Sequence, residues 1–128
     1  MKKLVITIFV AILSIGICLL SSFYVVNSAN ESEKYMNNIS NLLTENQFEK
    51  ALQEAKNFEN FWQNKGYFLS MILHHQILDE IEESIMLIKT FLNQGEEGKT
   101  DLYGEITTVS TKIKKLKESE MPSLENIL

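Results

Sequence analysis

The chain has 128 residues, enough for one domain, and its net negative charge argues against nucleic acid as a partner. It contains 12 basic residues, all of them Lys, and 17 acidic residues, so its formal charge is −5. Without Lys2 and Lys3 at the N-terminus, the remaining ten Lys face 17 acidic residues, a charge of −7. No basic patch is left to neutralise phosphates, so nucleic acid is not an expected partner. A single Cys excludes an intramolecular disulfide, and the low Gly and Pro content favours long helices.

The first predicted element is an uncharged, apolar stretch from Leu4 to Val26. As a helix it would be about 34 Å long, enough to cross a hydrocarbon core of about 30 Å. We therefore expect a transmembrane helix. A cleaved signal peptide is one alternative, but its apolar region would be only about 7–15 residues long. Lipoprotein attachment at Cys18 is another, and the bulky Ile17 before it disfavours that processing.

Charges on either side of this stretch predict its orientation. Lys2 and Lys3 precede it, whereas Glu31 and Glu33 are the first charges after it. Because positive flanks stay on the cytoplasmic side, we expect the N-terminus inside the cell. The chain from residue 27 onward is then expected on the outer side of the cell membrane.

Changes in apolar periodicity predict four helical segments after the span, the first of which is expected to continue the membrane helix out of the bilayer. In chain order they cover residues 31–43, 44–66, 67–92 and 100–122. The second is expected to begin at Thr44–Gln47, which has the form of a capping box, and to end at Gly66. Gly95 and Gly98 mark the loop before the fourth helix, and Pro122 is expected to end it. The predicted fold is therefore all-α, with a membrane anchor at residues 1–26 and an antiparallel, coiled-coil-like bundle of about four helices at residues 27–128.

The third predicted helix is expected to lie at the centre of this bundle. Its seam residues recur at heptad-like spacing: Tyr67, Met71, His74, Leu78, Ile81, Ile85, Ile88 and Leu92. In its first half the apolar residues go all the way round, so we expect other helices to enclose it. The expected core consists of Trp62, Met71, Leu78, Ile81, Ile106, Val109 and Ile113. The apolar tail residues Leu124, Ile127 and Leu128 are expected to dock against that core.

The order of these features resembles a family of short bacterial membrane proteins from low-GC Gram-positive organisms, domain of unknown function 4363. The residues that carry the resemblance are Phe48, Ala51, Trp62, the pattern Leu73-x-His75-x-x-Leu78-Asp79-x-Ile81-Glu82, and the closing Leu124-x-Asn126-Ile127-Leu128. Phe48 stands where the family is expected to have Trp. The resemblance covers essentially the whole chain and implies a membrane-anchored helical domain. It implies no activity.

One group of residues has the composition of a metal site. His75, Asp79 and Glu82 are spaced i, i+4 and i+7, which places an imidazole and two carboxylates on one side of a helix. A metal usually needs a third or fourth protein ligand, and the only other His is the neighbouring His74. The alternative is structural: a partly buried His75 held by Asp79 one turn away. We predict no metal, no cofactor and no catalytic residue, with these three as the only candidates.

The sequence contains no Gly-rich phosphate loop and no recognisable catalytic motif. We therefore expect a non-enzymatic interaction module that binds a membrane or envelope protein or a second copy of itself. The spacing of Ser14, Cys18 and Ser22 would let two spans approach closely, although chance is the simpler explanation in an apolar helix. A metal- or small-ligand-binding sensor domain, with its site around His75, is the alternative. An enzyme ranks last.

Overall fold

The computed structural model describes the backbone of residues 1–127 and the side chains of residues 1–120. Four α-helices and one short 3₁₀ helix make up this described part, which contains no strand. In chain order they are α1 (Lys2–Thr44), α2 (Phe48–Ile72), α3 (His75–Asn93), η1 (Gly95–Gly98) and α4 (Lys99–Ile127). The predicted all-α fold with an N-terminal apolar helix is confirmed.

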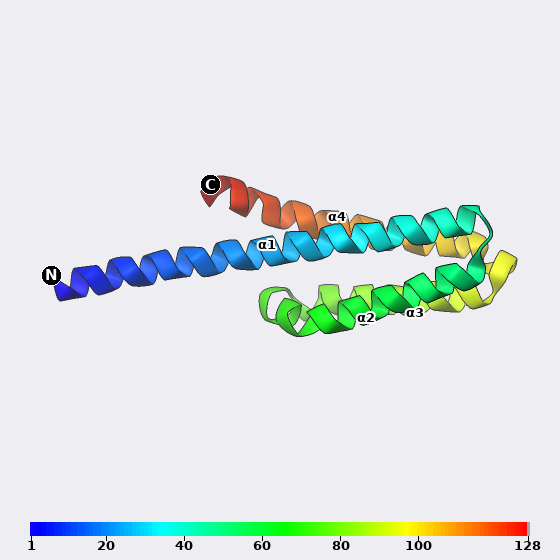
Figure 1. Cartoon of the computed structure of the whole chain (residues 1–128), viewed down its shortest axis with the longest axis horizontal. Coiled ribbons are helices and arrows are strands. Elements are labelled where there is room, and N and C mark those ends of the chain that lie inside the picture. Colours follow the sequence, from blue (N-terminus) through cyan, green and yellow to red (C-terminus); the bar gives the residue numbers. More distant parts are fainter. Residues whose placement is uncertain (128) are drawn as a thin grey trace.

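The four helices form a ring in which each one packs against its neighbours in sequence, and α4 packs back against α1. Figure 1 shows that the chain reverses direction at each connection, so all four neighbouring pairs are antiparallel. This up-and-down arrangement is the usual result of short connections between amphipathic helices. It brings the C-terminal part of α4 beside the middle of α1.

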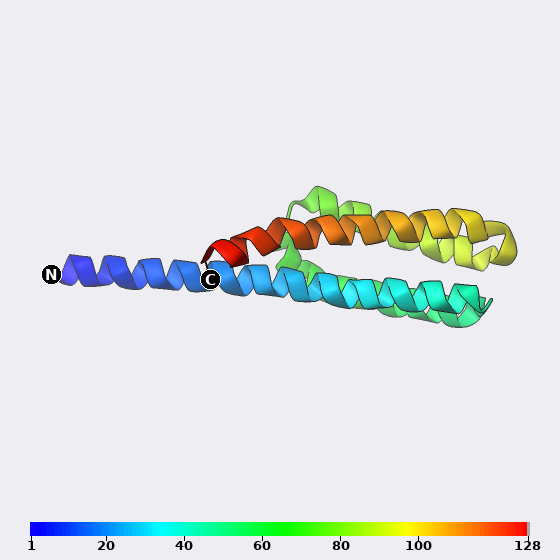
Figure 2. The same cartoon turned by 90° about the horizontal axis from the view of Figure 1, so that it is seen from above.

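Helix α1 is much longer than the bundle it belongs to. Its 43 residues would span about 65 Å at the usual helical rise. The first buried residue along it is Ser22, and from there Val25, Ala29, Met36 and others face the core. The N-terminal part of α1 projects alone beyond the other helices in both views, and the end of α4 reaches further toward it than the α2–α3 turn does (Figures 1 and 2). The bundle therefore starts near residue 22, within the stretch that the sequence predicts as a membrane span.

The core is apolar and includes an aromatic cluster between α1 and α2. The ring centroid of Tyr35 lies 5.4 Å from those of both Phe58 and Phe61, and that of Trp62 lies 6.3 Å from Phe58. Phe58 and Trp62 are each only 1% exposed. Six of the seven residues that the sequence predicts for the core are buried: Trp62, Leu78, Ile81, Ile106, Val109 and Ile113. The seventh, Met71, was predicted wrongly, because it is 66% exposed.

The predicted central helix is divided between two helices. Helix α2 continues through Gly66 to Ile72, and the chain turns at Leu73 and His74, where the backbone is extended. A Gly inside a helix costs about 0.5–1 kcal/mol, whereas full burial of a side chain such as Leu69 gains about 1.5–3 kcal/mol. Leu69 is 0% exposed, so its burial outweighs the helix-ending tendency of Gly66.

As a result, the expectation that other helices enclose the first half of the 67–92 segment was also wrong. The first three residues of the predicted seam, Tyr67, Met71 and His74, are exposed. The other five are buried: Leu78, Ile81, Ile85, Ile88 and Leu92. The heptad spacing therefore predicts the buried residues correctly within α3. It does not predict burial for the residues before the turn at Leu73 and His74, which belong to α2 or to the turn itself.

The connection between α1 and α2 also differs from its prediction. The hydroxyl of Thr44 donates to the backbone oxygen of Ser40 at 3.0 Å, so Thr44 ends α1 and does not cap α2. Asn46 adopts a positive φ of 58°, a conformation that Asn tolerates at helix ends. Helix α2 then begins at Phe48 with no side-chain cap from Gln47. The predicted capping box is therefore not formed.

The fourth helix begins at Lys99, close to its prediction, but does not end at Pro122. Its backbone remains helical to Ile127. A proline inside a helix lacks an N–H donor and its ring crowds the carbonyl four residues earlier, which usually kinks or ends the helix, but the helical backbone continues through Pro122 here. The predicted docking of Leu124, Ile127 and Leu128 concerns side chains outside the described residues.

Candidate functional site

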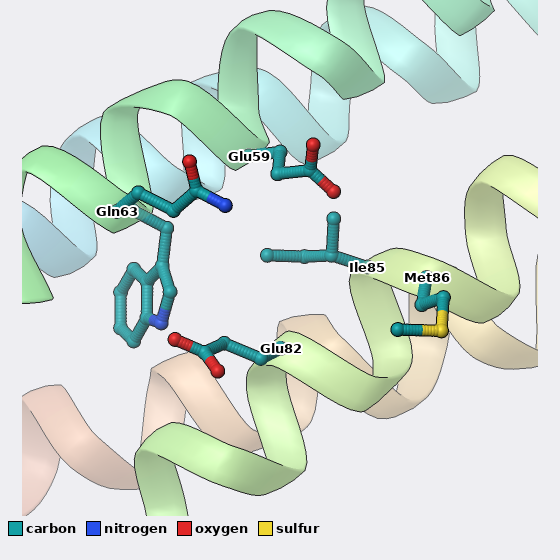
Figure 3. Close-up of a pocket in the computed structure, with 6 residues that line it drawn as sticks. Glu59, Gln63, Glu82, Ile85 and Met86 are labelled. Carbon is teal, nitrogen blue, oxygen red and sulfur yellow. The ribbon is translucent and has the colours of Figure 1, made fainter.

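A pocket of about 140 Å³ opens between α2 and α3. Helix α2 contributes Glu59, Trp62 and Gln63 to its lining, and α3 contributes Glu82, Ile85 and Met86. Figure 3 shows the side chains of Gln63 and Glu82 approaching it from opposite helices. These residues meet because two antiparallel helices joined at Leu73 and His74 place positions equidistant from that turn opposite each other.

The polar groups around this pocket are only partly paired. Both carboxylate oxygens of Glu59 accept hydrogen bonds from Nζ of Lys89, at 3.0 and 3.2 Å. This ion pair links α2 to α3, and both side chains are about 30% exposed. The indole Nε1 of Trp62, in contrast, is buried and has no hydrogen-bond partner among the described residues. A buried donor of this kind is usually satisfied by ordered water.

The size of the pocket decides what it can hold. Water occupies about 30 Å³ per molecule in the liquid, so 140 Å³ accommodates a few waters. Pockets for drug-sized ligands and cofactors are roughly 300–1,000 Å³. The lining offers carboxylates, an amide, an indole and a thioether, with no nucleophile beside a general base. These dimensions and groups suit hydration of Trp62 better than binding of a substrate.

The three residues that the sequence singles out do not meet at one site. His75 is the first residue of α3, and His75, Asp79 and Glu82 are all exposed. Only Glu82 lines the pocket. Among the described residues, no group of three or more His, Cys, Asp or Glu is placed to hold a metal ion. The expected burial of His75 was wrong, and no hydrogen bond joins it to Asp79 in the described part of the chain.

Sequence reasoning did not find Glu59, Gln63 or Met86 as pocket residues. Glu59 and Gln63 lie at i−3 and i+1 from Trp62, the only Trp of the chain, so they are within one helical turn of it. Their partners on α3, however, depend on where the hairpin turns. The predicted turn at Gly66 places Trp62 opposite a different part of the chain, so the pocket could not be assembled from the sequence.

The most distinctive region is the projecting part of α1. It is the one helix in the described chain that is long and apolar enough to cross a membrane, and none of its most apolar 18-residue stretch is buried. Twelve large apolar side chains between Leu4 and Phe23 are at least half exposed. Where this stretch meets the bundle, the hydroxyl of Ser22 donates to a carboxylate oxygen of Glu120 at 2.9 Å.

The model of a protein family, domain of unknown function 4363, matches residues 19–127. The match begins close to Ser22, where packing of the bundle begins, and runs through all four helices. No curated protein and no solved structure is significantly similar to the chain.

Proposed function

The chain belongs to the family of domain of unknown function 4363, which has no activity to transfer, and we propose its function from its geometry. The protein is a membrane-anchored helical bundle that lies on the outer side of the cell membrane. It works there as a non-enzymatic interaction or scaffold module for a membrane or envelope protein.

One observation carries this proposal: the exposed apolar half of α1. The central helix of a soluble protein would be covered by its neighbours, whereas none of the most apolar stretch is covered here. Burying each large apolar side chain is worth about 1.5–3 kcal/mol. With twelve such side chains exposed, the gain from entering a bilayer exceeds the typical stability of a whole domain, about 5–15 kcal/mol.

The orientation follows from the charges on either side of this stretch. Lys2 and Lys3 precede it, and Glu31 and Glu33 are the first charges after it. The positive-inside rule places the lysines in the cytoplasm and the bundle outside.

The interaction role rests on the character of the bundle. Its interior is filled by apolar side chains, and the pocket between α2 and α3 is water-sized. What the bundle presents to its surroundings is therefore its outer surface. Met86 on α3 is a large apolar residue on that surface, 66% exposed, and is a candidate contact for a partner.

Cysteine labelling in intact cells tests the anchor and its orientation. In a Cys18→Ser background, Glu97→Cys places a thiol at the far end of the bundle and Lys3→Cys places one before the span. A membrane-impermeant maleimide should label Glu97→Cys in intact cells and Lys3→Cys only after permeabilisation. The opposite pattern would overturn the orientation. Release of the protein from membranes by alkaline carbonate would overturn the anchor.

Photocrosslinking in native membranes tests the interaction role. A photoreactive amino acid replaces Met86, and the same amino acid at Thr107, an exposed polar position on α4, is the matched control. We expect a discrete crosslinked product from position 86 that depends on the native membrane and is missing from the purified protein. Equal products from both positions, or none from position 86, would contradict a specific interaction through this surface.

A further inference from the structure

The two ends of the bundle differ in chemical character. At the end far from the projecting helix, the connections contain Thr44, Glu45, Asn46, Asn93, Gln94, Glu96 and Glu97, all exposed. At the other end, the last turns of α2 carry four exposed apolar side chains before the turn into α3. These are Tyr67 (68% exposed), Phe68 (57%), Met71 (66%) and Ile72 (36%), and we call them the hairpin tip. Figure 1 shows that this turn lies on the side from which α1 projects.

Contacts with α1 fix the level of the hairpin tip along that helix. The ring of Phe68 meets the ring of Tyr24 edge-on, with centroids 5.9 Å apart. The ammonium group of Lys65, one turn earlier in α2, lies 4.9 Å from the centroid of the Tyr24 ring. The hairpin tip is therefore level with Tyr24, just before the end of the apolar stretch of α1.

That level corresponds to one surface of a bilayer. Leu4 and Tyr24 are 20 residues apart, which is about 30 Å along a helix and equals the usual thickness of the hydrocarbon core. If Leu4 lies at one boundary of the hydrocarbon, Tyr24 lies in the interfacial layer just outside the other. Aromatic rings such as those of Tyr24 and Tyr67 favour this boundary, and a Lys there can extend its ammonium group toward the headgroups.

The hydrogen bond between Ser22 and Glu120 limits how deep this end of the bundle can lie. It places a carboxylate near Ser22, which is two residues or about 3 Å deeper than Tyr24, and a carboxylate is costly inside hydrocarbon. The polar interfacial layer accepts such a group, especially one that accepts a hydrogen bond. The hairpin tip is thus suited to the interfacial layer and not to the interior of the bilayer.

We propose that the hairpin tip is a second membrane contact, which inserts into the interfacial layer of the leaflet on the bundle side. This inference rests on the proposed membrane anchor, because α1 brings the tip to the bilayer surface. The contact holds the bundle upright against the membrane at two points, α1 and the α2–α3 turn. It directs the polar far end, with Glu96 and Glu97, away from the lipid.

Spin labels on the full-length protein in single-copy nanodiscs of phosphatidylglycerol and phosphatidylethanolamine test this contact. In the Cys18→Ser background, labels are placed by Met71→Cys or Tyr67→Cys in the tip, by Ile12→Cys in the span, and by Glu97→Cys at the far end. Collisions with lipid-soluble oxygen are compared with collisions with a water-soluble nickel complex. We expect the ratio of oxygen to nickel collisions in the tip to be several-fold higher than at position 97.

The span and far-end labels separate the possible failures. A low ratio at position 12 would show that the anchor itself is wrong. A high ratio at position 12, with position 71 equal to position 97, would overturn only the contact of the tip with lipid. The label at position 71 could also be protected from the nickel complex in crowded proteoliposomes but not in single-copy nanodiscs. That result would assign the tip to a contact with a second copy of the chain, and the lipid contact would be rejected.

Discussion

Truncating Ile81 should strongly destabilise the bundle. Its side chain is 0% exposed and lies in the α3 seam that faces the interior. Ile81→Ala removes three carbon atoms, which at about 0.8 kcal/mol each is a transfer loss of about 2.4 kcal/mol. The cavity left in a packed core adds to this, so the total should be about 3–4 kcal/mol. The higher helix propensity of Ala returns only a few tenths of a kcal/mol.

Two further variants give the measurement a scale. Ile81→Val removes one carbon and should cost about 0.5–1.5 kcal/mol. Met86→Ala is the matched control, because Met86 lies on the same helix but is 66% exposed. Its effect should be within about 0.5 kcal/mol, as is usual for exposed positions. The predicted order of destabilisation is therefore Ile81→Ala, then Ile81→Val, then Met86→Ala.

The chain contains its own probe for this experiment. Trp62 is the only Trp and is 1% exposed, so its fluorescence should report unfolding of the bundle. Urea titration of the full chain in nanodiscs gives the free energy of unfolding for each variant. If Ile81→Ala were no more destabilising than Met86→Ala, the α3 seam would not be packed in the free protein. It would then be an exposed surface that becomes buried only when a partner binds.

Two matched pairs test local features of the bundle by the same titration. A Cβ at Gly98 would lie 2.5 Å from the backbone oxygen of Phe91, so Gly98→Ala should lower the free energy of unfolding by about 1–3 kcal/mol. A Cβ at Gly104 would have nothing within 4 Å, so Gly104→Ala should raise the free energy of unfolding by about 0.5–1 kcal/mol. Equal effects of the two would contradict the close approach at Gly98. The buried hydroxyl of Ser28 has no partner among the described residues, so Ser28→Ala should gain about 1 kcal/mol. Ser32→Ala loses a 2.8 Å bond to the Ser28 backbone and should stay within about 0.5 kcal/mol of wild type, so a larger gain there than at position 28 would refute the reasoning.

The amphipathic parts of the chain were predictable because their apolar spacing is unambiguous. In α4, Ile106, Val109 and Ile113 follow a spacing of three and four, and all three are buried. Thr107 and Thr108 fall between them and are exposed. Only one face of such a segment can turn inward, so periodicity alone determines which residues form the core.

The position of the α2–α3 turn was not predictable by the same rules. Gly66 has the local signature of a helix end, while Leu73 and His74 have none, yet the chain turns at the latter pair. The decisive term is the burial of Leu69 against other helices, which is a tertiary effect. In an antiparallel hairpin, moving the turn by seven residues displaces each facing partner by twice that number, about four helical turns. This displacement is why the pocket around Trp62 could not be predicted.

The prediction that other helices enclose the first half of the 67–92 segment is wrong for a physical reason. The same reason also supports the contact of the hairpin tip with lipid. Apolar residues around the whole circumference of a helix indicate only that water does not surround it. Protein and lipid can each provide that environment, and sequence periodicity does not distinguish between them. The sequence pattern predicts that the segment from Tyr67 to Ile72 lies in the protein interior, but most of its side chains are exposed at the level of Tyr24. Under the proposed contact, the boundary between headgroups and acyl chains at that level would provide the apolar environment that the pattern predicts, without any further protein around the segment.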